Sequence, residues 1–247
     1  MTLKNRVALV TGGAGGIGSA ISKKLAAEGA AVIITYNSNP DRAKQLLNGL
    51  KGENHHIFHA PVNDSEQLNN LSTFIEDKYG RLDVLVNNAG ITTPVAHEDL
   101  EGLTDDWIDK IFTINVRGSF AMIRVCKDLL MKSNNGLVVN ISSVAAVTGI
   151  GSNVAYCASK AAIDSITRSL ARALAPTIRV VSVSPGWVLG EYTKTVDPAY
   201  LQTQLDATPL NRLATPEDVA NAVYAVATTL TFSTGCIIPV DGGRTLI

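Results

Sequence analysis

Short apolar segments alternate with longer amphipathic segments along nearly the whole chain. Apolar runs of about four to eight residues bounded by turn residues indicate buried strands, and apolar positions spaced three or four apart indicate helices. The pattern predicts seven strands, at residues 6–10, 31–36, 55–62, 83–90, 136–143, 178–186 and 236–243. It predicts helices between them, at residues 19–30, 41–50, 65–80, 104–132, 154–174 and 215–228. Strands and helices in this alternation form βαβ units, so we expect an α/β fold with a parallel sheet covered by helices on both faces.

The longest stretch without a predicted element is residues 185–213, which follows the sixth predicted strand. Ligands of open parallel sheets bind at the carboxyl ends of the strands. We therefore expect one domain over residues 1–247, with a substrate lid at about residues 186–213. The lid mixes aromatic and charged side chains, and this mixture permits either an apolar or a hydroxylated substrate; examples are Trp187, Tyr192, Lys194 and Tyr200.

The overall composition narrows the class of protein. The 247 residues are 46% apolar and 17% charged, with a formal net charge of −1 and no basic run, which argues against a nucleic-acid partner. No apolar stretch is long enough for a membrane span, and the first residues lack the pattern of a secretory signal. Three scattered cysteines and four histidines show no metal-ligand spacing. We expect no metal and a reducing compartment, most simply the cytoplasm.

A glycine-rich turn joins the first predicted strand to the first predicted helix. Thr11, Gly12, Gly16 and Gly18 follow the pattern T-G-x-x-x-G-x-G. Glycines let backbone amides approach a pyrophosphate, and the N-terminus of the next helix favours its negative charge. The turn therefore predicts a dinucleotide site.

The end of the second predicted strand bears on which dinucleotide is bound. A carboxylate there would hydrogen-bond the ribose hydroxyls of NAD and repel the additional phosphate of NADP. The chain has Tyr36, Asn37 and Ser38 at this place and no acid. This favours NADP(H) and leaves NAD(H) as the alternative.

A tyrosine and a lysine one helical turn apart carry the candidate chemistry. Tyr156 and Lys160 lie on the same side of the predicted helix 154–174. Ser143 ends the strand before this helix, so its hydroxyl can meet the tyrosine in one cleft. A lysine charge at about 4 Å is sufficient to lower the pKa of a phenol by about 3 units.

These motifs, with Asn87-Asn88-Ala89-Gly90, Asn115 and Pro185-Gly186, resemble the short-chain dehydrogenase/reductase family. The resemblance covers essentially the whole chain and is strongest to 3-oxoacyl-(acyl-carrier-protein) reductases and to related sugar, polyol and small-ketone enzymes. It implies a single-domain Rossmann fold, doubly wound around a sheet of about seven strands. It also implies hydride transfer between a nicotinamide cofactor and a carbonyl or secondary alcohol substrate.

The resemblance assigns roles to individual residues. Tyr156 would be the general acid and base, Lys160 would lower its pKa and bind the nicotinamide ribose, Ser143 would hold the substrate oxygen, and Asn115 would complete a proton path. Trp187 would contact the substrate together with Ser143 and Tyr156. The expected cofactor contacts are Thr11, Gly12, Gly15, Gly16, Ile17, Gly18, Tyr36, Asn37, Ser38, Val62, Asn88, Ala89, Gly90, Tyr156, Lys160, Pro185, Gly186 and Val188.

The chain departs from the family pattern at several positions. Pro61 stands where an aspartate usually meets the adenine, Gly190 where a threonine usually holds the carboxamide, and Gly15 where NADP-preferring relatives often have a basic residue. Ala175-Pro176-Thr177 offers no cation for an acidic carrier protein. This last difference argues against a carrier-protein substrate. A carrier-protein reductase and a non-catalytic dinucleotide-binding regulator are kept as alternatives to the reductase of small carbonyl substrates. The resemblance further implies a homotetramer built through helices 104–132 and 154–174.

Overall fold

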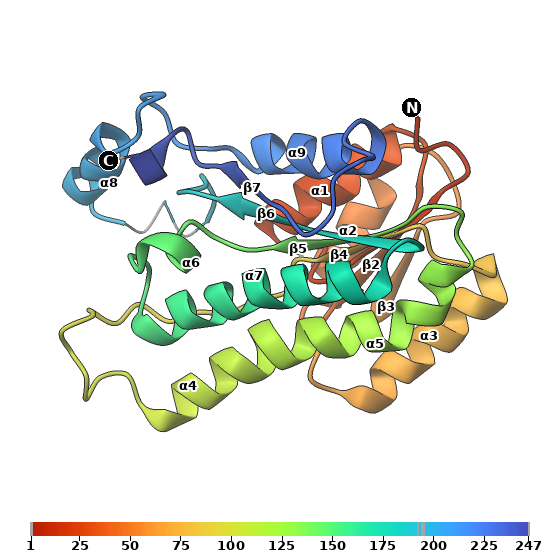
Figure 1. Cartoon of the computed structure of the whole chain (residues 1–247), viewed down its shortest axis with the longest axis horizontal. Coiled ribbons are helices and arrows are strands. Elements are labelled where there is room, and N and C mark those ends of the chain that lie inside the picture. The colour runs from red at the N-terminus through yellow and green to blue at the C-terminus, as the bar shows by residue number, and fades with distance from the viewer. Residues whose placement is uncertain (1, 192, 194–195, 247) are drawn as a thin grey trace.

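One parallel sheet organises the computed structural model, which describes residues 2–191, 193 and 196–246 (Figure 1). Within these residues seven strands are hydrogen-bonded in the order β3-β2-β1-β4-β5-β6-β7. The strands are β1 (Val7–Val10), β2 (Ala31–Tyr36), β3 (His56–His59), β4 (Val84–Asn87), β5 (Gly136–Ile141), β6 (Ile178–Pro185) and β7 (Ile237–Val240). All six pairings are parallel, which confirms the predicted α/β fold.

Helices cover both faces of the sheet (Figure 1). Successive side chains of a strand point to opposite faces, so Ala8 and Val10 of β1 join one apolar cluster while Val7 and Leu9 join another. The first cluster is closed by α1 (Gly16–Ala27), α2 (Pro40–Asn48) and α9 (Pro216–Thr228), and the second by α3 (Ser65–Tyr79), α5 (Ser119–Met131) and α7 (Val154–Leu174).

The single helix predicted at residues 104–132 is wrong in one respect. The segment consists of α4 (Asp105–Ile111), a π-helical stretch η1 (Phe112–Gly118) and α5. A π-helical stretch widens the turn and shifts the helical register, and such stretches are frequent at functional sites. No residue preference in the sequence marks it.

The stretch taken as irregular also contains a helix that the apolar pattern does not predict. Helix α8 (Pro198–Asp206) begins after Asp197, whose side chain accepts a hydrogen bond from Ala199 N at 2.7 Å. An acidic cap followed by proline is a helix-start signal, and it could have identified α8. Two short elements were also missed, α6 (Ala145–Thr148) and the 3₁₀ turn η3 (Arg244–Leu246). Tyr192 and Lys194 of the expected lid lie outside the described residues.

The strand order reverses between β1 and β4, because β2 and β3 lie on one side of β1 and β4 to β7 on the other. The carboxyl ends of the strands next to such a reversal form the binding crevice of doubly wound sheets. Among the helices that the structure describes, none combines the length and the apolar character required to cross a membrane.

Candidate active site

The turn after β1 is tied to the loop after β4 by the hydroxyl of Thr11. Its Oγ1 accepts hydrogen bonds from Asn88 N at 2.9 Å and Ala89 N at 3.0 Å and donates to Val86 O. Thr11 is only 1% exposed. Thr11 therefore lies beneath the crevice, where its hydroxyl connects the two loops, and its side chain does not line the crevice.

The glycines of the turn leave room that a side chain would fill. A Cβ atom at Gly18 would lie 2.5 Å from Gly12 O and 2.6 Å from Asn88 Nδ2, and Gly12 has a φ of +59°. Both positions therefore require glycine. Because α1 begins at Gly16, its first backbone N–H groups face this open cradle, which fits the pyrophosphate of a dinucleotide.

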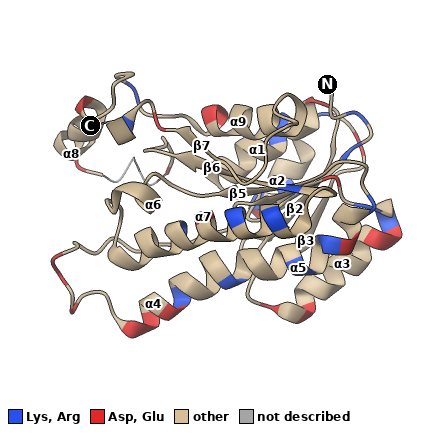
Figure 2. Ribbon diagram, viewed as in Figure 1, with Lys and Arg blue, Asp and Glu red and all other residues tan. Residues whose placement is uncertain are grey.

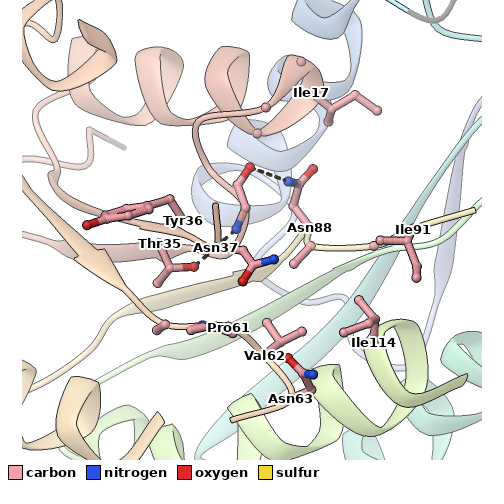
Figure 3. Close-up of a pocket in the computed structure, with 17 residues that line it drawn as sticks. Ile17, Thr35, Tyr36, Asn37, Pro61, Val62, Asn63, Asn88, Ile91 and Ile114 are labelled. Carbon is pink, nitrogen blue, oxygen red and sulfur yellow. Dashed lines mark hydrogen bonds between the residues drawn. The ribbon is translucent and has the colours of Figure 1, made fainter. Parts of the chain in front are cut away.

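A cavity of about 390 Å³ extends from this cradle along the ends of β1, β2 and β4 (Figure 3). Tyr36 and Asn37 line it, whereas Ser38 is not among its lining residues. Pro61, Val62 and Asn63 form the opposite wall (Figure 3). Every described residue that lines this cavity is uncharged; the others are Gly12, Gly15, Gly16, Ile17, Gly18, Thr35, Ala60, Asn88, Ala89, Gly90, Ile91 and Ile114.

A second cavity adjoins the first and shares Ile17, Asn88, Gly90 and Ile91 with it. Residues from three distant parts of the chain meet here. Its further lining residues are Thr92, Ile141, Ser142, Ser143, Tyr156, Lys160, Pro185, Gly186 and Val188. The structure thus brings together the predicted Ser143, Tyr156 and Lys160 with the predicted contacts at the end of β6.

Helix α7 holds Tyr156 and Lys160 in place from its first turns. Asn153 caps the helix by accepting a hydrogen bond from Tyr156 N at 2.7 Å. Lys160 is buried, and its Nζ donates to Ile141 O at 2.8 Å and lies 5.6 Å from the centroid of the Tyr156 ring. The stripe predicted from the sequence therefore faces the crevice.

The electrostatics of this pair differ from the expectation. Burial lowers the pKa of Lys160 from 10.5 to about 8, with Asp164 acting in the opposite direction. Burial also raises the pKa of Tyr156, and a hydrogen bond with Ser143 opposes that rise. The expected lowering of the Tyr156 pKa by Lys160 is wrong for this structure, because the cost of burying a phenolate dominates.

Asn115 lies in η1 and joins the loop after β4 to helix α7. Its Oδ1 accepts from Ile91 N at 2.8 Å, and its Nδ2 donates to Ile91 O at 3.0 Å and Ser159 Oγ at 3.1 Å. A Cβ atom at Gly90 would lie 3.3 Å from Asn115 Oδ1 and 3.8 Å from Lys160 Nζ. Asn115 is therefore packed directly behind the crevice, next to the lysine.

Asn87, the first residue of the Asn87-Asn88-Ala89-Gly90 motif, is not among the residues that line these cavities. It is buried in the sheet, where its Nδ2 donates to Asn140 Oδ1 at 2.9 Å and to Ser119 O. Side chains alternate along a strand, so consecutive residues at the end of β4 point in opposite directions.

A third cavity of about 290 Å³ opens on the far side of Ser143 and Tyr156. Trp187 lines it and makes an edge contact with Tyr200 of α8, with ring centroids 5.8 Å apart. Gly186 and Val188, which were expected as cofactor contacts, also line it; the sequence did not identify the remaining lining residues, which are Thr92, Val144, Ala145, Ile150, Gly151, Ser152, Gln204 and Arg244. Gly190 lies outside all three cavities among the described residues, and its backbone is hydrogen-bonded by the hydroxyl of Thr193.

Comparisons with known proteins agree with this geometry. A family model described as enoyl-(acyl carrier protein) reductase matches residues 12–245. The chain is 35% identical over 248 residues to 3-oxoacyl-(acyl-carrier-protein) reductase FabG of Thermotoga maritima, covering 98% of this chain and 99% of that protein. It is 33% identical to a 3alpha-hydroxysteroid dehydrogenase of Mediterraneibacter gnavus, with 98% of both chains covered.

Among solved structures, the chain is similar to the short-chain dehydrogenase/reductase SDR:Glucose/ribitol dehydrogenase from Brucella melitensis. The TM-score is 0.90 at 28% identity, and the match covers 98% of this chain and 97% of that chain. The three names describe different activities, and each contains the word reductase or dehydrogenase.

Proposed function

The chain belongs to the short-chain dehydrogenase/reductase family, and from this premise we propose that it is an NADP(H)-dependent carbonyl reductase in which Tyr156 donates the proton. As a member of the family it is a nicotinamide-dependent oxidoreductase that acts on CH–OH groups of small-molecule substrates. This excludes the non-catalytic regulator. The finer assignment depends on one observation, the meeting of Ser143, Tyr156 and Lys160 in a cavity next to the glycine cradle.

The chain's own side chains supply what carbonyl reduction needs. When bound, the nicotinamide supplies the hydride. Ser143 and Tyr156 line both the second cavity, which adjoins the glycine cradle, and the third cavity, which we call the outer cavity. A carbonyl oxygen placed between them can therefore accept hydrogen bonds from both hydroxyls. Tyr156 carries the phenolic proton that the forming alcoholate would accept; burial raises the pKa of Tyr156, which makes it a weaker acid, and the hydrogen bond with Ser143 acts in the opposite direction.

Lys160 and Asn115 support that donor in the proposed mechanism. Lys160, whose Nζ donates to Ile141 O, lines the second cavity and would bind the ribose of the nicotinamide. Asn115 fixes the loop at Ile91 with both atoms of its amide and so sets the width of the cavity at Gly90. Residues that fix geometry in this way contribute through orientation and not through bond making.

The preference for NADP(H) is supported by the lining of the first cavity. Tyr36 and Asn37 line this cavity at the end of β2 and would meet the adenosine ribose, and neither carries a negative charge that would repel a phosphate there. Asn63, two residues after Pro61, would provide the polar contact for the adenine that an aspartate usually makes in the family pattern. Pro61 is therefore compatible with cofactor binding.

The testing experiment is a titration of the protein with NADPH and with NADH, followed by turnover on a panel of ketones. We expect tighter binding of NADPH. The Tyr156→Phe variant should bind NADPH like the unchanged protein but lose about 10² to 10⁴-fold in kcat. Equal turnover in this variant would refute the assigned role of Tyr156, and tighter binding of NADH would refute the cofactor preference.

A second candidate is reduction of 3-oxoacyl thioesters carried by acyl carrier protein. It is supported by the similarity to the Thermotoga maritima reductase, and the absence of a cation at Ala175-Pro176-Thr177 weighs against it. This candidate predicts much faster turnover of the carrier-bound thioester than of the same thioester on a small thiol. Equal rates would exclude it.

A further inference from the structure

The outer cavity contains a single kind of charge. Among the described residues that line it, Arg244 is the only charged side chain, and the rest are hydroxyl, amide, aromatic or aliphatic groups. Arg244 comes from η3 at the end of the chain, which lies beside α8 (Figure 1), and it shares the cavity with Ser143 and Tyr156. A substrate held at these hydroxyls therefore has an arginine within the same small space.

The guanidinium of Arg244 is fixed by α8. Its Nη1 donates to Gln204 O at 3.1 Å, and its Nη2 donates to Gln204 Oε1. Gln204 is itself buried. Among the described residues these hydrogen bonds engage two of the five N–H groups of the guanidinium, so the group is oriented while donors remain for a ligand.

No carboxylate neutralises this arginine at ion-pair distance within the described part of the chain. Tyr200 and Asp241 both raise the pKa of Arg244 against the effect of burial, and the Asp241 carboxylate accepts hydrogen bonds from Gly243 N, Thr245 N and Thr245 Oγ1. Asp241 is thus used by the turn that carries Arg244. Burial also lowers the pKa of the Arg244 guanidinium from its ordinary value, which shows that the charge is partly removed from water.

We propose that Arg244 binds an anionic group of the substrate, so that the enzyme acts on small oxo acids or hydroxy acids whose carboxylate lies opposite the reacting carbon. This rests on the proposed function and specifies its substrate class. A guanidinium matches a carboxylate with two parallel hydrogen bonds, and such charge-assisted pairs are stronger than neutral ones. Trp187 and Tyr200 enclose the carbon chain between the two polar ends.

The proposal is tested with pairs of substrates that differ only in charge. Acetoacetate is compared with methyl acetoacetate, and 4-oxopentanoate with methyl 4-oxopentanoate, at saturating NADPH. We expect kcat/KM to be about tenfold or more higher for each acid than for its ester. In Arg244→Met this ratio should fall to about one, and in Arg244→Lys it should take an intermediate value because the charge remains but the planar fork is lost.

A matched control is Arg212→Met. Arg212 lies near the same end of the molecule but lines a different cavity and pairs with Asp218. This variant should keep the acid-to-ester ratio of the unchanged protein. Folding of each variant is checked by urea denaturation, because Arg244 also connects η3 to α8.

Binding gives a readout that does not depend on turnover. The same acids and esters are titrated into the protein loaded with NADP⁺, which cannot reduce them, and the tryptophan fluorescence is recorded. Tighter binding of the acids that is lost in Arg244→Met supports the proposal even if no ketone is reduced, a result that would refute only the proposed function. An acid-to-ester ratio that is near one in the unchanged protein, or that persists in Arg244→Met, overturns the proposal while leaving the reductase intact.

Discussion

At Lys160 the proposed catalytic role conflicts with the stability of the fold, because a charged ammonium group is buried there. Lys160 is 7% exposed, and within the described part of the chain its ammonium donates one hydrogen bond, to Ile141 O, so the charged form loses most of its hydration when the chain folds. The lowering of its pKa from 10.5 to about 8 corresponds to about 3 kcal/mol at neutral pH. Asp164, one turn further along α7, offsets part of the cost of burial. A position that weakens the fold in this way is characteristic of a functional site.

The first prediction concerns how this cost depends on pH. Below pH 8 Lys160 is charged in the folded and unfolded states, and the full penalty is present; between pH 8 and 10.5 the folded state releases its proton first, so stability rises with pH. The Lys160→Met variant lacks this term. We therefore expect its free energy of unfolding relative to the unchanged protein to fall by up to about 3 kcal/mol from pH 7 to 10.5. Urea denaturation of both proteins at several pH values measures this, and a constant difference would contradict the lowered pKa.

At the scale of elements, the π-helical stretch η1 connects the cofactor cavity to the helix layer. Gly118 ends η1 and lies against Val62, which lines the first cavity. A Cβ atom at Gly118 would lie 2.6 Å from Val62 Cγ2 and 2.9 Å from its Cβ. The same stretch carries Asn115, so one irregular element supports both ends of the crevice.

The second prediction is that Gly118→Ala weakens both the fold and cofactor binding. Alanine in a helix gains up to about 1 kcal/mol over glycine, but overpacking costs about 1 to 3 kcal/mol, so the second effect dominates. We expect lower stability in urea and weaker NADPH binding. Val62→Ala removes the Cγ atoms, and the double variant should recover part of both losses. Unchanged NADPH affinity in Gly118→Ala would show that η1 and the cavity are not connected.

The third prediction concerns the start of α9. Thr215 and Asp218 form a reciprocal cap, and Arg212 donates to both carboxylate oxygens of Asp218, at 2.6 and 2.9 Å. The hydrogen bonds from Arg212 hold the pKa of Asp218 well below its ordinary value of 3.8. This contribution is present at neutral pH and is lost as the pH falls below that value. Asp218→Asn should cost about 1 kcal/mol at pH 7, the value of a typical cap, and progressively less below about pH 4 in thermal unfolding. A pH-independent difference would contradict it.

The elements that the sequence predicted correctly are those whose periodicity is long or whose ends are marked. Helix α7 was predicted at its observed bounds, because Asn153 caps it and its apolar stripe is continuous. Helix α8 was missed, since Gln204 is its only buried residue and no apolar stripe exists to detect. The π-helical stretch was missed because nothing in its composition departs from an α-helix.

At the scale of the whole molecule, the parts of the candidate site that could be predicted are those that belong to motifs in the sequence. Residues in spaced motifs, such as Ser143, Tyr156 and Lys160, were identified because their separation alone implies that they meet. Arg244 and Gln204 lie forty residues apart without a shared motif, and only the packing of η3 on α8 places them in the outer cavity. Tyr36 and Asn37 line the first cavity and Ser38 does not, because the path of the loop after the strand, and not residue type, decides which residues face the crevice.

The last prediction concerns the assembly. Helices α4, α5 and α7 lie on one face of the sheet (Figure 1), and they leave several large apolar side chains exposed to water. Phe120 of α5 is 43% exposed and Val154 of α7 is 47% exposed. Figure 2 shows that uncharged residues separate the charged residues along these helices. Exposed apolar surface on this scale is typical of interfaces, and homo-oligomers are closed and symmetric.

The family resemblance implies a homotetramer, so we expect light scattering to give four times the mass of one chain. Phe120→Asp should reduce the mass to that of a smaller assembly, because a carboxylate buried at an interface without a partner is strongly unfavourable. Phe232→Asp is the matched control, since Phe232 is fully exposed and belongs to the turn between α9 and β7 and not to these helices. It should leave the mass unchanged. A mass of one chain for the unchanged protein, or a tetramer that survives Phe120→Asp, would show that this face is not where the copies meet.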